Sequence, residues 1–110
     1  MAAGDRSEVR LYGPSNIGAS AGTVATVPAS RVWVTKQIIL CNTNNVDAWV
    51  SVAVGDVTDS TNCFMYQLPI SGNDTMVFDT ALVMTAGETI QATSDRGGIT
   101  IIGNGWSKEL

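Results

Sequence analysis

The chain is unusually rich in β-branched residues. Valine, isoleucine and threonine supply 32 of its 110 residues, whereas leucine occurs five times. β-Branched side chains lose rotamer freedom in a helix and pack well on a pleated sheet. No stretch of helical length repeats apolar residues at three- and four-residue spacing. The composition therefore predicts an all-β fold.

Clusters of glycine, asparagine, aspartate and serine divide the chain into short segments that alternate like strands. The segments with this pattern are residues 8–12, 24–27, 31–41, 48–54, 62–68, 75–79, 88–93 and 99–102. Turns at such spacing are typical of a sandwich or a jelly roll. A chain of 110 residues is long enough for one core. We expect a single-domain antiparallel β-sandwich of jelly-roll type, with about seven or eight short strands.

Residues 31–41 make the longest segment, and Trp33 lies on the face opposite its aliphatic residues. Lys36 falls on the aliphatic face, which indicates a bulge or a side chain that reaches out at the sheet edge. Trp49 also lies opposite the valines of its segment. The expected core combines the apolar faces of all strands: Val32, Val34, Ile38, Leu40, Val50, Val52, Val54, Phe64, Ile90 and Ile101.

The outward tryptophans allow three interpretations. A loop covers the outer face, or the outer face is an interface, where tryptophan is a favoured anchor, or the rings stack on sugars. Trp106 near the C-terminus predicts that the terminal segment docks on its own domain or on a neighbour. We therefore take Trp33, Trp49 and Trp106 as candidate interface residues.

The sequence offers no recognisable catalytic arrangement. It contains no histidine, which excludes a Ser-His-Asp triad, and no phosphate-binding loop of the Walker type. Most acidic residues stand in turn-like contexts, where capping is the ordinary role of aspartate: Asp47, Asp56, Asp59, Asp74 and Asp95. We expect no enzyme, no catalytic residue, no cofactor and no metal. A hydrolase that uses two of the carboxylates is the weakest alternative.

Two smaller features leave alternatives open. The loop with Asp56, Asp59 and Asn62 offers oxygens for Ca²⁺ but matches no EF-hand, so a solvated loop is the simpler interpretation. Cys41 and Cys63 are either free thiols of a reducing compartment or a disulfide, because the sequence does not fix their geometry.

Low charge bears on the partners. The charged fraction is 15%, the formal net charge is −4, and the six basic residues are scattered along the chain. Duplex binding needs clustered basic residues, so we expect no nucleic-acid partner. No segment approaches the roughly 18 apolar residues of a membrane span, and the N-terminus has no apolar run of a signal peptide, so we expect no membrane partner. A weakly charged surface fits a protein that is packed against others.

Several motifs resemble those of small β-sandwich virion structural proteins of tailed bacteriophages. Residues 26–29 read Thr-Val-Pro-Ala and precede a strand that ends Ile-Ile-Leu-Cys-Asn at residues 38–42. A later stretch from Leu82 to Ile90 contains Gly87 and Glu88, and Gly103 lies in the final strand. The resemblance covers about residues 23–103 and leaves the first 22 residues outside it.

The resemblance implies an accessory component of a virion, made in the host cytoplasm: a capsid decoration, a neck or collar element, or a tail protein. Its partners would be further copies of itself as a homo-oligomer and other virion proteins, namely major capsid, neck or tail proteins. We expect an N-terminal arm over residues 1–22 and a sandwich over residues 23–110 that ends in a short C-terminal tail. The alternative is a carbohydrate-binding module that uses outward-facing Trp33 and Trp49.

Overall fold

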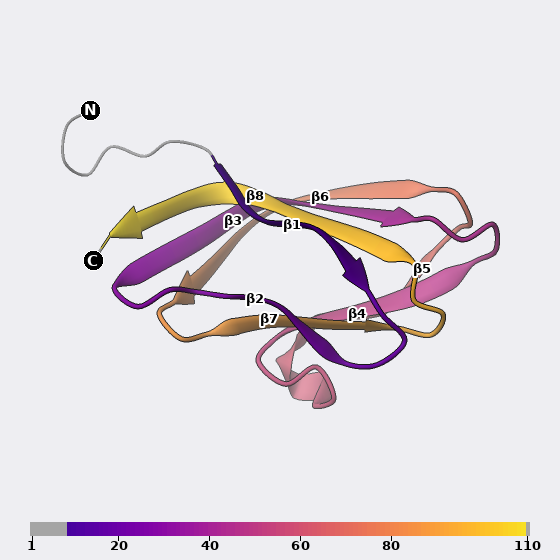
Figure 1. Ribbon diagram of the computed structural model, residues 1–110, viewed down its shortest axis with the longest axis horizontal. Coiled ribbons are helices and arrows are strands. Elements are labelled where there is room, and N and C mark those ends of the chain that lie inside the picture. The colour runs from indigo at the N-terminus through magenta and orange to yellow at the C-terminus, as the bar shows by residue number, and fades with distance from the viewer. Residues whose placement is uncertain (1–8, 110) are drawn as a thin grey trace.

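Eight strands form two four-stranded antiparallel sheets in the computed structural model, which describes residues 9–109 (Figure 1). Sheet A has the order β1-β8-β3-β6 and sheet B the order β2-β7-β4-β5. The elements are β1 (Val9–Ile17), β2 (Gly22–Thr26), β3 (Arg31–Asn42), β4 (Ala48–Val54), the 3₁₀ turn η1 (Ser60–Asn62), β5 (Cys63–Ile70), β6 (Thr75–Thr85), β7 (Thr89–Ser94) and β8 (Ile99–Glu109). The predicted all-β sandwich is confirmed.

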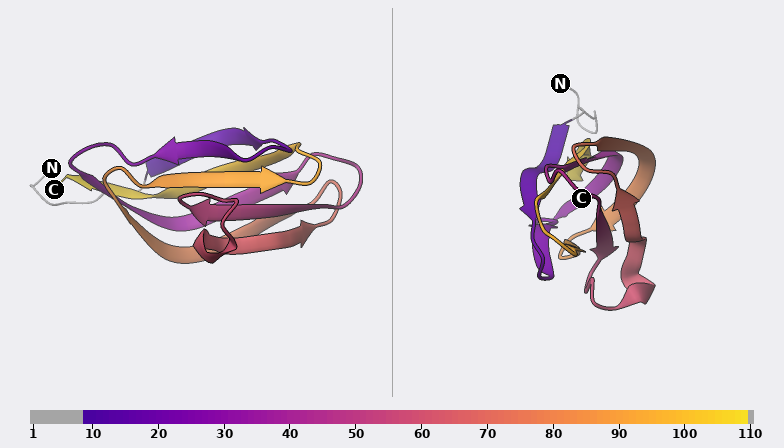
Figure 2. Two further views of the ribbon diagram at one scale, coloured as in Figure 1. Left: turned by 90° about the horizontal axis from the view of Figure 1, so that it is seen from below. Right: turned by 90° about the vertical axis from the view of Figure 1, so that its right-hand side faces the viewer.

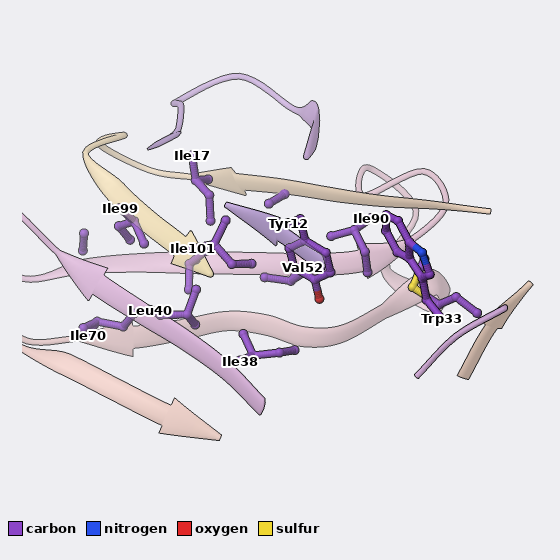
Figure 3. Close-up of a cluster of buried hydrophobic side chains, with 14 of the residues drawn as sticks. Tyr12, Ile17, Trp33, Ile38, Leu40, Val52, Ile70, Ile90, Ile99 and Ile101 are labelled. Carbon is purple, nitrogen blue, oxygen red and sulfur yellow. The ribbon is translucent and has the colours of Figure 1, made fainter. Parts of the chain in front are cut away.

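The hydrophobic core lies between the two sheets (Figure 3). Six of the predicted core residues are confirmed within it: Ile38, Leu40, Val50, Val52, Ile90 and Ile101. Val54 is half-buried against the cluster and Val32 is half-buried. Val34 is buried on the opposite face of β3, outside the cluster. Met84, which the sequence analysis did not assign to the core, is fully buried there.

A β-bulge at Lys36 decides which side chains of β3 face the core. The pairing of β3 with both of its neighbours shifts at this residue, so the predicted bulge is confirmed. An extra residue reverses the alternation between the two faces. Trp33, before the bulge, therefore faces the same side as Ile38 and Leu40, after it. The expectation that Trp33 faces outward is wrong, because it assumed unbroken alternation.

A second irregularity in β5 turns Phe64 out of the core. Gln67 has a φ of 47°, and its backbone N–H donates to Ser51 Oγ at 2.8 Å. Two residues of β5 oppose Ser51 of β4 at this point, so the alternation reverses again. Met65 and Leu68 pack against the core in consequence, whereas Phe64 is 39% exposed. The prediction of Phe64 as a core residue is wrong.

Both ends of the described chain contribute strands where an arm and a tail were expected. β1 pairs with β8 and buries Tyr12 and Ile17, so residues 9–17 belong to sheet A rather than to an arm. The remaining part of the expected arm before residue 9 lies outside the described residues. β8 continues to Glu109, so Trp106 lies in a strand rather than in a tail. Pairing of the first and last strands gives both segments ladder hydrogen bonds that the sequence alone does not reveal.

Asn42, at the end of β3, ties together the turns at one end of the sandwich. Its side chain is fully buried, and Nδ2 lies within 3.0–3.3 Å of the carbonyl oxygens of Val46, Ile70 and Ser71. Its Oδ1 accepts hydrogen bonds from the backbone and side-chain nitrogens of Asn44 at 3.0 Å. Because buried carbonyls need partners, this one amide fixes how β3, β4 and β5 meet.

Close packing between β1 and β8 depends on a glycine. The ring of Tyr12 lies over Gly103, where a Cβ atom would overlap it, and the Tyr12 and Trp33 ring centroids are 6.1 Å apart. We expect Gly103→Ala to lower the free energy of unfolding by about 1–3 kcal/mol, because overpacking forces buried neighbours to move. Urea denaturation followed by circular dichroism measures the change.

Gly22→Ala is the matched control for this substitution. A Cβ at Gly22 would meet nothing within 4 Å, so the control is expected to stay within about 0.5 kcal/mol of the wild type. Equal urea midpoints for Gly103→Ala and the wild type would contradict the tight contact between Tyr12 and β8.

Candidate interaction surface

The three tryptophans do not form one surface. Trp33 is 8% exposed within the core, as Figure 3 shows beside Tyr12 and Ile90. Trp49 is half-buried on β4 of sheet B, and Trp106 is half-buried on β8 of sheet A. The sugar-stacking pair of outward-facing Trp33 and Trp49 is therefore wrong, because the two side chains belong to different sheets and one is interior. Interface roles for Trp49 and Trp106 stay predictions.

The outer face of sheet A, turned away from sheet B, carries two apolar rows. Cross-strand pairing sets Val77, Ile39 and Ile102 side by side in one row and Val83, Val34 and Trp106 in the other. Val77 and Val83 are 55% and 60% exposed. Single exposed aliphatic residues are ordinary, but contiguous apolar rows on a sheet face are typical of interaction surfaces.

A polar row crosses the same face between the two apolar rows. It runs from Arg10 on β1 through Asn104 and Gln37 to Asp79 on β6. Asn104 Nδ2 donates to Gln37 Oε1 at 3.2 Å. A groove of about 580 Å³ follows this row, and Lys36 at the bulge also lines it. The face therefore offers Arg10 at one edge, Asp79 at the other edge, and two amides with Lys36 between them.

The side of the sandwich bounded by the edge strands β5 and β6, here called the β5/β6 side, concentrates exposed apolar residues. Four of the six large hydrophobic residues that are most exposed in the described chain lie on these strands: Phe64, Tyr66, Val77 and Val83. A mostly apolar groove of about 440 Å³ opens between the strands and reaches Ile38 of the core. In the end-on view of Figure 2, β1 and β2 lie on the opposite side, called the β1/β2 side.

The loop that was considered for Ca²⁺ is built by turns that its own aspartates cap. Asp56 Oδ1 accepts from the backbone and hydroxyl of Thr58, and Asp59 Oδ1 accepts from those of Thr61, at 2.6–3.0 Å. These hydrogen bonds lower the pKa of both carboxyls, and the bond from the threonine hydroxyl contributes more than the bond from the threonine backbone. No cluster of three or more metal-binding side chains occurs within residues 9–109. The carboxylates are thus engaged in capping, which supports the solvated-loop interpretation.

Cys41 and Cys63 are free thiols, both half-buried. Cys41 lies on β3 in sheet A and Cys63 begins β5 in sheet B. Burial, and to a smaller degree the charge of Asp59, raises the pKa of Cys63. A raised pKa keeps a thiol protonated and unreactive, so Cys63 lacks the character of a nucleophile.

Searches for relatives add a fold likeness. No protein-family model and no curated protein sequence matches the chain. A subunit of the disulfide-linked pili of Bacillus endospore appendages superposes with a TM-score of 0.52 at 10% identity, over 96% of this chain and 88% of that one. The Drosophila NLP core, a histone-binding pentamer, gives 0.44 at 18% identity, over 94% and 98%. A pentameric capsid protein from metagenomic phage sequences gives 0.39 at 15%, over 94% and 61%.

The pilus subunit and this chain share a fold. None of the helices among the described residues is long and apolar enough to span a membrane. The apolar rows of sheet A and the β5/β6 side form the candidate interaction surface.

Proposed function

We propose that the protein is a non-enzymatic structural subunit that assembles in many copies. The observation that carries the proposal is the pair of contiguous apolar rows on the outer face of sheet A. Val77 exposes more than half of its surface beside Ile39 and Ile102. Val83 does so beside Val34 and Trp106. Leaving such a face in water is costly, and an apolar patch framed by polar residues is typical of protein–protein contact.

The low charge of the chain supports the same proposal. Only 15% of residues are charged, compared with about 25% in an average soluble domain. A surface with few charges associates readily.

The finer proposal is an accessory component of a tailed-phage virion, which decorates the capsid or belongs to the neck or tail. It is supported by the sequence motifs around residues 26–29, 38–42 and 82–90. The turn motif at residues 26–29 connects β2 of sheet B to β3 of sheet A, and the second motif forms the last residues of β3. In this role the partners are further copies and the shell or tube protein beneath them.

The test is the protein content of particles purified from cells that carry this gene. Mass spectrometry is expected to find the protein in the particles at several copies each, and antibody labelling is expected to place it at the head, neck or tail in electron micrographs. Particles that lack the protein would overturn the virion proposal.

A further inference from the structure

Asp79 occupies an unusual position for an aspartate in this chain. The other aspartates of the described residues lie in turns or loops: Asp47, Asp56, Asp59, Asp74 and Asp95. Asp79 instead lies in the middle of β6, at the edge of sheet A. Arg10 lies on β1, at the other edge of the same sheet. The two residues end the same cross-strand row, so a cation marks one edge and an anion the other.

Strand direction makes these two edges compatible with each other. Each strand of sheet A is antiparallel to its neighbour, so β6 runs opposite to β1. Sheet B repeats the relation, since β5 runs opposite to β2. A second copy in the same orientation can be placed beside the first so that its β1/β2 side meets the β5/β6 side of the first copy. The next copy's β1 is then antiparallel to β6, and the next copy's β2 is antiparallel to β5.

We propose that copies of this chain dock head-to-tail, with the β5/β6 side of one copy against the β1/β2 side of the next and with Asp79 facing the next copy's Arg10. The inference rests on the proposed function, because it adds to the apolar face of sheet A a second surface, at the edges of both sheets, through which copies associate. Charge complementarity selects the partner side, and the exposed Phe64 and Tyr66 supply apolar area for burial.

The register that joins the two charges also matches apolar residues. In an antiparallel pair, residue numbers rise along one strand and fall along the other. When the next copy's Arg10 lies opposite Asp79, the next copy's Leu11 therefore lies opposite Phe78. Phe78 lines the apolar groove of the β5/β6 side. The next copy's Val9, 43% exposed, falls opposite Thr80 at the rim of that groove. The charged pair and the apolar contacts thus agree on one register.

Head-to-tail contact uses two different surfaces, so it generates a closed ring when the rotation between copies closes and a filament when it does not. A two-fold contact between two β5/β6 sides is the competing arrangement, and it leaves Arg10 outside the interface. Protection is the other competing role, since charges on edge strands commonly prevent edge-to-edge association. These alternatives predict different responses to charge reversal.

The experiment compares sedimentation velocity of wild type, Asp79→Arg, Arg10→Asp and the double variant at matched concentrations. Each single variant sets like charges against each other, so we expect the apparent dissociation constant of the oligomer to rise about tenfold or more. The double variant restores opposite charges and is expected to assemble within about threefold of wild type.

Glu109→Arg and Lys108→Asp are the controls, because they change the net charge by the same amounts and lie beyond the segment of β8 that pairs with β1. Both are expected to assemble like wild type. Single variants that assemble normally, a double variant as impaired as the singles, or an Arg10→Asp variant without effect would overturn the head-to-tail contact. Stronger association of Asp79→Asn, which removes the edge charge, would overturn it in favour of edge protection.

Failure of this inference and failure of the proposed function give different results. An oligomer that is indifferent to all four substitutions leaves a structural subunit whose contact lies elsewhere. A wild type that is monomeric at every concentration and missing from particles removes the proposed function as well.

Discussion

Trp33→Ala is expected to lower the free energy of unfolding by about 3–5 kcal/mol, the cost of emptying a large buried aromatic site. Trp33 is 8% exposed and packs beside Tyr12 between the sheets. The free energy of unfolding of a small domain is roughly 5–15 kcal/mol, so the variant loses a large share of it. Urea denaturation followed by far-ultraviolet circular dichroism measures the loss.

Trp49→Ala is the matched control, because it removes the same side chain from a half-buried position on sheet B. We expect it to cost less than half as much as Trp33→Ala. Trp33→Phe keeps most of the volume and gives a measurable variant if the alanine variant does not fold. If Trp33→Ala unfolds at the wild-type midpoint, Trp33 faces solvent and the bulge at Lys36 is misplaced.

Asn42→Ala is expected to cost about 2–4 kcal/mol, because it strips the buried carbonyl of Ile70 and the partly buried carbonyl of Val46 of their donor. Asn42→Asp is expected to cost at least as much. Its shape is preserved, but a carboxylate donates nothing and places negative charge against carbonyl oxygens. The same urea transitions report both variants.

The control for this pair is Asn62→Ala, which removes an exposed amide that donates to Asp56 O at 3.1 Å. It is expected to cost about 1 kcal/mol or less, since water can replace the lost donor. A stability of Asn42→Asp close to wild type would show that donation by Nδ2 does not hold the turns together.

The positions of the strands could be predicted from local chemistry, but the full lengths of β1, β6 and β8 and the faces of β3 and β5 could not. Stiff β-branched residues and turn clusters are local signals, and they placed β3, β4 and β7 to within a residue or two. Lys36 on an apolar face even located the bulge. The pattern did not show how the bulges change the faces of the strands. One extra residue reverses the alternation, so Trp33 of β3 faces the core and Phe64 of β5 faces outward.

The candidate surface was harder to predict, because it depends on which strands are neighbours. Arg10, Gln37, Asp79 and Asn104 are scattered in the sequence and join in one row only through the strand order of sheet A. The one signal in the sequence was the position of Asp79 inside a run of strand-forming residues, since aspartate is disfavoured in strands. Without the partner strands, it could not be linked to Arg10.

The most direct test of head-to-tail assembly is the mass of the purified protein in solution, measured by light scattering behind a sizing column over a wide range of concentrations. We expect a species of three or more copies of the 11.5 kDa chain, because a ring built from a head-to-tail contact needs at least three subunits to close. A mass that stays at one copy up to about millimolar concentration, or that stops at a two-fold dimer, would contradict it.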